Sequence, residues 1–433
     1  MRSFEIKSAN IPPEDNLFEY DTIIIGAGAA GLGGAHYLKT KAPHERIAIF
    51  EASPESEIGG KVHSAIVDGI PYDMGAHIVG CFCDRTHELI KQYGLKLDPF
   101  PFDEYSCIAL TKKYGFWRTV RASAIYWWLS NKHRVSKPWD FESIEKDSIR
   151  KKSVQQLIEE YDLRPLESIF QACLPGFGYG PLSSIPAGLA FSYIRLAINF
   201  MVPFTPTFIR LPLGIVQGGY QGLFQKMSKK LQSDNCILLP NTKIQKVEPL
   251  RGSGIAVVGA ERRWIAKRVL ITCSPTLLEL PHLTAKERAL FGSVSTTRYG
   301  TTLFRHSGKF PSYVNPNPKG VEPVIIGTPN PDKNAYVSVA YAYVLNGQEE
   351  CAEKALRKTL RTNFGVEITE IYTRRYVNLW PRLPFETMIN GGFHQLKTMN
   401  RNGIYFSGSV CSFESVEAVL QSSRDVVDRT YAV

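Results

Sequence analysis

A glycine-rich run between an apolar strand and a helix constrains this 433-residue chain more than any other feature. The run is Gly26-Ala27-Gly28-Ala29-Ala30-Gly31, with a strand expected over 21–25 and a helix through Leu38. Such a turn lets backbone N–H groups approach a pyrophosphate, whose charge the helix N-terminus favours. Glu51 ends a second apolar strand, Ile47–Phe50, where a carboxylate can accept hydrogen bonds from an adenosine ribose. This order predicts a dinucleotide-binding site.

The next motifs indicate which dinucleotide is bound. Gly59-Gly60-Lys61 follows Glu51, and a strand pair then holds Val67-Asp68-Gly69 and Tyr72-Asp73-Met74-Gly75-Ala76-His77. A nicotinamide-binding domain usually continues with further βα units instead. The order found here resembles the flavin amine oxidase superfamily, which includes monoamine oxidases, protoporphyrinogen oxidases and carotenoid desaturases. The resemblance implies FAD, with Gly59-Gly60 near the flavin-proximal phosphate and the Met74-Gly75-Ala76 segment near the isoalloxazine.

Later segments fit the same resemblance. A glycine-led helix after Gln217 and a strand with Val247 would return the chain to the cofactor, where the backbone at Val247 meets the adenine. Ser274 matches a turn of the family, and the Gly408-Ser409 turn carries serine where the family usually has an acid. The implied cofactor site consists of Gly26, Gly28, Ala29, Ala30, Gly31, Glu51, Ala52, Gly59, Gly60, Lys61, Met74, Gly75, Ala76, His77, Val247, Ser274, Gly408, Ser409 and Val416.

The resemblance predicts an α/β fold. A Rossmann-like FAD-binding domain of the glutathione-reductase and amine-oxidase type would carry an inserted α+β substrate domain. The expected division is an N-terminal arm over 1–20, an FAD-binding domain over 21–82, 218–280 and 395–433, and a substrate-binding domain over 83–217 and 281–394.

Composition limits the remaining choices. With 44% hydrophobic and 21% charged residues, the chain reads as globular, and no run of about eighteen uncharged apolar residues is present. Eight scattered cysteines without a second close pair give no zinc pattern, so we expect no metal, reduced thiols and a cytoplasmic protein. Cys411 lies near the flavin-facing C-terminal segment, where it is either a packed thiol or a covalent flavin link. We expect non-covalent FAD.

A narrower resemblance lies in the middle of the chain. Pro175–Gly180, Ile185–Ala187 and Gln217–Leu223 look like the corresponding segments of bacterial polyenoic fatty acid isomerases. In those enzymes FAD moves a hydride out of and back into an unsaturated acyl chain, without net oxidation. Their carboxylate-binding arginine lies in a stretch corresponding to 98–112, which holds none here; Lys112 or Arg118 are alternatives.

Flavin hydride chemistry asks little of side chains beyond orienting the substrate and excluding water. Candidate residues for this role, each equally a candidate for core packing, are Phe177, Tyr179, Tyr220, Trp380 and Phe413. His77 is either an acid–base group or a hydrogen-bonded buried histidine. Amine oxidases often carry a lysine on the strand after a Tyr-Gly pair, and the strand after Tyr299-Gly300 has none. That argues against amine oxidation assisted by a lysine-bound water.

The formal charge of +10 allows a nucleic acid, an anionic membrane or an acidic ligand as partner. No nucleic-acid motif is present. Basic and aromatic residues alternate over 112–137, which suits peripheral membrane contact or a solvated face. Three functions stay open: a flavin isomerase or desaturase of a lipophilic unsaturated substrate, an oxidase of an amine or porphyrinogen-like molecule, and a non-catalytic FAD-binding partner protein. The oligomeric state is not predicted.

Overall fold

A seven-stranded sheet forms one end of the computed structural model, which describes residues 18–80, 82–99, 114–135, 140–194, 214–315, 318–330 and 333–431. The strands run in the order β7-β2-β1-β10-β9-β8, and β16 also pairs with β10. All neighbours are parallel except β10–β9 and β9–β8. The strands are β1 (Tyr20–Ile25), β2 (Ile47–Phe50), β7 (Ile237–Leu239), β8 (Ile244–Pro249), β9 (Ile255–Gly259), β10 (Arg263–Ile271) and β16 (Ile404–Phe406).

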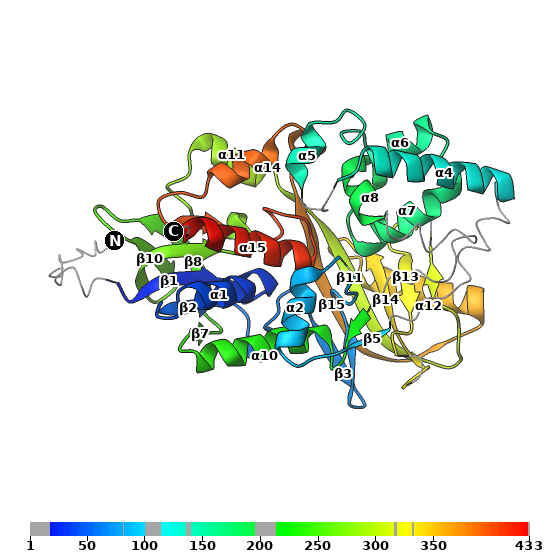
Figure 1. The fold of residues 1–433 in the computed structure, drawn as a ribbon. Helices are drawn as coiled ribbons and strands as arrows, with labels where there is room; N and C mark the ends of the chain where they lie inside the picture. The colour runs from blue at the N-terminus through cyan, green and yellow to red at the C-terminus, as the bar shows by residue number, and fades with distance from the viewer. Residues whose placement is uncertain are drawn as a thin grey trace, which may run out of the picture.

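Helices from separated parts of the chain cover this sheet (Figure 1). They are α1 (Ala29–Lys41), α2 (Asp84–Gln92), α10 (Tyr220–Ser233) and α15 (Val416–Thr430). Helix α1 contacts both α10 and α15, and glycines permit its close approach. A Cβ at Gly33 would lie 2.5 Å from Leu420 Cδ2, and one at Gly34 would lie 2.7 Å from Leu270 Cδ2. The predicted Rossmann-like α/β fold class is confirmed.

A second sheet forms the other half of the molecule. Its five antiparallel strands follow the order β12-β13-β14-β11-β15. Tyr299 and Leu303 pack toward a β3–β4 hairpin, whereas Phe304 packs toward helix α12, as the two-residue period of a strand requires. The elements are β11 (Ser295–His306), β12 (Tyr313–Val314), β13 (Pro323–Gly327), β14 (Val337–Tyr343), β15 (Ile368–Arg382), β3 (Ser64–Val67), β4 (Ile70–Asp73) and α12 (Glu349–Phe364).

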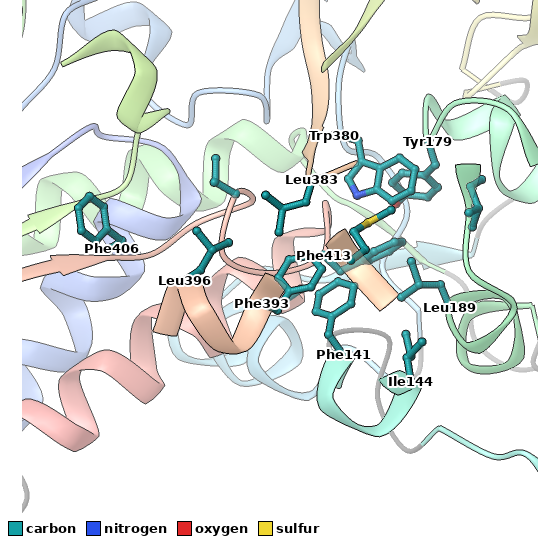
Figure 2. Packing of buried hydrophobic residues seen from close by; sticks show 14 of the residues in the cluster. Phe141, Ile144, Tyr179, Leu189, Trp380, Leu383, Phe393, Leu396, Phe406 and Phe413 are labelled. Atoms are coloured by element: carbon teal, nitrogen blue, oxygen red, sulfur yellow. The ribbon is translucent and has the colours of Figure 1, made fainter. Parts of the chain in front are cut away.

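A group of helices lies above the second sheet, and others lie above the seven-stranded sheet (Figure 1). Their apolar residues join those of the seven-stranded sheet in one core, in which the Phe141 and Phe393 rings stack with centroids 3.5 Å apart (Figure 2). The helices are α4 (Phe116–Lys132), α5 (Phe141–Glu145), α6 (Val154–Glu160), α7 (Glu167–Cys173), α8 (Ala187–Tyr193), α11 (Ala285–Gly292), α13 (Phe385–Ile389) and α14 (Gly392–Thr398). A two-stranded pair consists of β5 (Leu97–Pro99) and β6 (Gly214–Val216). Single 3₁₀ turns cover Glu55–Glu57, Arg164–Leu166, Pro175–Phe177, Leu182–Ser184 and Pro275–Leu277.

Some predicted features lie outside the described residues. These include most of the N-terminal arm, the 100–112 stretch with Lys112, and both ends of the basic segment 112–137. Among the described residues, all strands of the seven-stranded sheet come from 20–50, 237–271 and 404–406. The domain boundaries themselves stay a prediction.

Asp73 joins the β3–β4 hairpin to the start of α10. Its Oδ1 accepts hydrogen bonds from the Ser64 hydroxyl at 2.5 Å and from the Tyr220 backbone N–H at 2.9 Å. The Tyr220 amide belongs to the first turn of α10, whose preceding residue, Gly219, supplies no side-chain cap. Burial raises the pKa of Asp73 to about 6. A carboxylate thus caps a helix that is distant in sequence.

The raised pKa predicts a pH-dependent stability. The pKa of Asp73 is about 6 in the folded protein, against an ordinary value of 3.8. The stabilisation of the folded state by protonated Asp73 is therefore complete below pH 3.8 and is lost as the pH rises through 6. The shift of about 2 units corresponds to about 3 kcal/mol. The free energy of unfolding of the native protein should therefore fall by that amount relative to Asp73→Asn between about pH 3 and about pH 7 in urea titrations. Exposed Asp425 provides a control, Asp425→Asn, and equal pH profiles for native protein and Asp73→Asn would contradict the prediction.

Candidate cofactor and substrate site

The first glycine turn forms a tight link between β1 and α1. The Gly26 amide donates to the Phe50 carbonyl at 2.7 Å, and Gly26 has φ +107°, which favours glycine. A Cβ at Gly31 would lie 1.9 Å from the Gly26 carbonyl oxygen, so only glycine fits there. Ala29 and Ala30 open α1, and no side chain caps its N-terminus. Its first-turn amides therefore remain available to an anion.

The second glycine turn lies directly against the first. The Gly59 amide donates to the Ala27 carbonyl at 3.0 Å, and a Cβ at Gly60 would lie 3.2 Å from Gly28 Cα. A Cβ at Gly28 would meet nothing closer than 3.9 Å, so the protein itself leaves space at that position. Two glycine turns and an uncapped helix N-terminus thus form a cradle that fits a pyrophosphate.

Glu51 lies at the end of β2 beside this cradle. Its Oε2 accepts from the Ala27 amide at 2.7 Å and its Oε1 from the Ser53 amide at 2.9 Å. The segment before β8 runs alongside, because the Thr242 amide donates to the Glu51 carbonyl at 2.7 Å and the Asn241 amide to the Ser53 carbonyl at 3.0 Å. Sequence reasoning missed Asn241 and Thr242, although a Pro-Asn-Thr turn before a strand was a visible signal.

The remaining residues predicted for the adenosine end lie around this segment. Val247 is buried further along β8, and its amide donates to the Glu279 carbonyl at 3.0 Å. Ser274 begins the turn after β10, with its hydroxyl 2.8 Å from the Thr276 hydroxyl. Ala52 is exposed next to Glu51. The Val247 amide, which was predicted to meet the adenine, thus already donates to a protein carbonyl. Thr242 is the residue of this segment that hydrogen-bonds to the backbone of Glu51.

Lys61 connects the second glycine turn to the C-terminal segment. Its Nζ lies 2.9 Å from Glu414 and donates to the Ser409 hydroxyl at 3.4 Å. Gly408 has φ +96°, and a Cβ there would lie 3.0 Å from the Thr272 carbonyl oxygen. Sequence reasoning identified the serine in place of an acid but missed Glu414, which supplies a carboxylate to Lys61. The signal was weak, because Glu414 stands five residues beyond the motif.

The Met74–His77 segment lies against the second glycine turn. Met74 is buried, and a Cβ at Gly75 would lie 1.9 Å from the Lys61 carbonyl oxygen. Ala76 is half-buried against the core of the cofactor domain. This close backbone approach explains the glycine and fixes where His77 points.

His77 lies in an aromatic environment. Its Nδ1 is 3.2 Å from the Gly75 carbonyl oxygen, its ring stacks on Tyr341 with centroids 5.6 Å apart, and Phe177 lies at 6.1 Å. Burial lowers the pKa of His77, which favours the neutral imidazole. His77 is thus half-buried and hydrogen-bonded beside the backbone that we expect to face the flavin, which leaves both alternatives for its role open.

Three of the predicted aromatic residues lie together (Figure 2). The ring centroid of Tyr179 is 5.5 Å from Trp380 and 4.7 Å from Phe413. The Tyr179 hydroxyl donates to the Glu414 carbonyl at 2.8 Å, which joins this aromatic cluster to the segment that binds Lys61. Trp380 has φ +41°, a conformation that costs energy for a bulky residue and is enriched at ligand sites.

Tyr220 lies apart from that cluster. It begins α10, where its ring stacks on Phe224 with centroids 6.1 Å apart, within the core of the cofactor domain. Phe177 packs with His77, so the five candidate aromatics divide into a cluster of three, Phe177 beside the histidine, and Tyr220 in a separate core. The glycine-led helix was expected after Gln217, and it begins at Tyr220, but the sequence could not show which core the Tyr220 ring enters.

The C-terminal helix, α15, begins at one of the residues predicted for the cofactor site. Val416 is the first residue of α15, and the side chain of Ser415 caps it by accepting from the Ala418 amide at 3.1 Å. Burial raises the pKa of the Cys411 thiol to about 12, so the thiol stays protonated at neutral pH. A protonated thiol is a poor nucleophile, and non-covalent FAD stays a prediction.

Comparisons with known proteins agree with this geometry. Residues 24–92 match the family model described as an NAD(P)-binding Rossmann-like domain. A thiamine thiazole synthase of Schizosaccharomyces pombe is 40% identical over 70 residues, which cover 15% of this chain and 21% of that protein. The match thus spans about a fifth of that curated relative.

Similarity over the whole chain comes from solved structures. A CLA-producing fatty acid isomerase from P. acnes has a TM-score of 0.79 and 17% identity, over 95% of this chain and 99% of that one. This likeness concerns the fold, and it is of the kind that the resemblance to the flavin amine oxidase superfamily predicts. A putrescine oxidase bound to putrescine has a TM-score of 0.67 and 16% identity, over 96% of this chain and 99% of that one. The predicted resemblance to this superfamily is confirmed at the level of fold.

A substitution at Gly28 tests whether the cradle binds a pyrophosphate. Its φ of −78° suits any residue and its Cβ would meet no protein atom within 3.9 Å, so Gly28→Ala should fold normally. The added methyl group would occupy the approach of a pyrophosphate, and FAD affinity should fall at least about tenfold. Flavin absorbance per protein and titration of the flavin-free protein measure this effect.

Gly222→Ala is the matched control, since Gly222 lies in α10 with no atom within 4 Å of its Cβ position. Full flavin content in Gly28→Ala, with melting temperatures equal for all three proteins, would show that the cradle holds no pyrophosphate.

Proposed function

We propose that this protein is an FAD-dependent enzyme that acts by flavin hydride transfer on a lipophilic, unsaturated acid, and that it isomerises double bonds rather than oxidises amines. One observation carries the proposal: Tyr179, Trp380 and Phe413 form a buried aromatic cluster that the Tyr179–Glu414 hydrogen bond joins to the cofactor segment. The fold likeness to a fatty acid isomerase supports it.

The cofactor end follows from the cradle. The amides at the start of α1 would hold the pyrophosphate, Glu51 the ribose, and Lys61 with Ser409 the flavin-proximal side. Bound FAD supplies a hydride acceptor and donor at N5. The chain's part is to bind the substrate, orient it and exclude water. His77, neutral and surrounded by rings, contributes no charge to that environment.

An apolar substrate suits the aromatic cluster. Burying an acyl chain against such walls contributes roughly 25 cal/mol per Å² of apolar area, whereas a protonated amine loses hydration there. The strand β11 that borders this region carries Tyr299, Thr301 and Leu303 on its buried positions and has no lysine over its length. This composition favours a hydrocarbon over an amine.

The surroundings of Arg382 favour a substrate that carries an acidic group. Its guanidinium lies 5.1 Å from the Trp380 ring centroid and donates to the Thr297 hydroxyl at 2.8 Å, and a Cβ at Gly180 would lie 3.1 Å from its Nη2. No carboxylate among the described residues forms an ion pair with Arg382, and burial lowers its pKa. A half-buried guanidinium with neutral neighbours gains most from an anionic ligand, which a fatty acid provides.

The reaction itself distinguishes the proposal from its alternatives. With linoleic acid under argon, the holoenzyme should generate conjugated diene, seen as new ultraviolet absorbance, without net flavin reduction. With putrescine in air it should release no hydrogen peroxide. Peroxide release from amines would replace the proposal with amine oxidation, and failure of every substrate to change the flavin spectrum anaerobically would favour a non-catalytic role.

Arg382→Gln tests the acidic end. Loss of a charge-assisted hydrogen bond should raise KM for the free acid by roughly 10- to 100-fold and leave the methyl ester unaffected. Arg298→Gln is the matched control, because Arg298 also lies on this sheet but pairs with Glu349 at 2.9 Å. Equal losses for acid and ester, or equal effects of the two substitutions, would remove Arg382 from substrate binding.

A further inference from the structure

Helix α4 exposes large aromatic side chains to solvent. Trp117 is 79% exposed, Trp127 59% and Trp128 49%. Trp117 and Trp128 are eleven residues apart, three helical turns, so they lie on one side of the helix. In Figure 1, α4 runs along the outer edge of the group of helices above the second sheet, away from the seven-stranded sheet. Apolar side chains scattered singly over a surface need no explanation, whereas exposed rings gathered on one helix indicate a binding surface.

The opposite side of α4 is firmly packed. The Tyr126 hydroxyl donates to the Ala190 carbonyl at 3.0 Å, and its ring contacts Phe170 edge-on with centroids 5.1 Å apart. Ala122 and Leu129 are buried on the same side. The tryptophans therefore project from a fixed helix, and their exposure does not come from a loosely attached segment.

The exposed side is also basic. Residues 114–135 contain no aspartate or glutamate. Arg118 pairs with Asp162 at 2.9 Å, but Arg121, Lys132 and Arg134 have no ion-pair partner among the described residues. Lys132 Nζ lies 4.6 Å from the Trp128 ring centroid, so charge and aromatic surface are directly adjacent.

We propose that α4 docks the protein onto an anionic lipid surface, with its tryptophans at headgroup level and its basic residues against the lipid charges. Indole rings favour the interface between water and hydrocarbon, and basic residues beside them add electrostatic attraction. No helix of the described part of the chain is both long and apolar enough to cross a bilayer, so this contact is peripheral.

A second copy of the chain fits this surface poorly. Dimers usually have two-fold symmetry, which would place Arg121 and Lys132 of one α4 near the same residues of the other. Like charges across an interface oppose association, whereas a membrane of anionic lipid supplies the opposite sign over the whole face. The positive charge of α4 therefore favours an anionic lipid surface over a second copy of the chain as its partner.

Sedimentation of the full-length holoprotein with vesicles tests this proposal. Vesicles of phosphatidylcholine with phosphatidylserine should bind the protein at low salt, and vesicles of phosphatidylcholine alone should bind it at least about tenfold less tightly. Binding should weaken as salt is raised, because the exposed charges are screened. Tryptophan emission should shift to shorter wavelength on binding, as the indoles leave water.

Matched variants locate the surface. Combined Trp117→Ser, Trp127→Ser and Trp128→Ser should reduce binding at least about tenfold, whereas Ile66→Ser, Leu277→Ser and Leu345→Ser, which remove three other exposed apolar side chains, should not. Arg121→Glu with Lys132→Glu should abolish binding, and Lys354→Glu with Lys358→Glu, the same charge change on α12, should leave most of it. Circular dichroism checks that each of these variants remains folded.

Three outcomes would overturn the proposal: no binding of the native protein to anionic vesicles at low salt, equal loss in both members of a matched pair, or a change of oligomeric state in the α4 variants without a change in vesicle binding. None of these measurements uses enzyme activity, so the proposed reaction and the docking surface can fail independently.

Discussion

The backbone contact between the two glycine turns is the constraint on which the rest of the structure depends. The Gly59 amide donates to the Ala27 carbonyl, while a Cβ at Gly60 would press on Gly28 at 3.2 Å. This contact positions the uncapped start of α1 opposite the segment that continues into Lys61. Any side chain large enough to separate the turns would also move Glu51, whose carboxylate accepts from the Ala27 amide. The candidate cofactor site and the contact between the two glycine turns therefore depend on the same backbone segments.

Buried carboxylates hold together segments that are distant in sequence. Asp73 accepts from the first-turn amide of α10, and Glu417 accepts from the amides of Arg85 and Thr86 at 3.0 and 2.9 Å, at the start of α2. Both side chains are buried, and this burial raises the pKa of both acids. A domain assembled from separated segments needs such links, because local hydrogen bonds cannot join them.

Sequence reasoning succeeded where local chemistry decides the structure. The two glycine turns, strands β1 and β2, and helix α1 follow from patterns that a few neighbouring residues set. It fell short where tertiary contacts decide. The opposite placements of Tyr220 and Tyr179, and the contribution of Glu414, depend on which core each side chain enters, which periodicity does not encode.

The cofactor and aromatic regions meet at two consecutive residues. Phe413 packs its ring against Tyr179, while the Glu414 side chain pairs with Lys61 and its carbonyl accepts from the Tyr179 hydroxyl. Two consecutive side chains thus lie in different environments: Phe413 among aromatic rings and Glu414 beside a lysine. The fold alone does not decide which substrate such a site takes, since this chain is similar in fold to both a fatty acid isomerase and a putrescine oxidase at similar coverage.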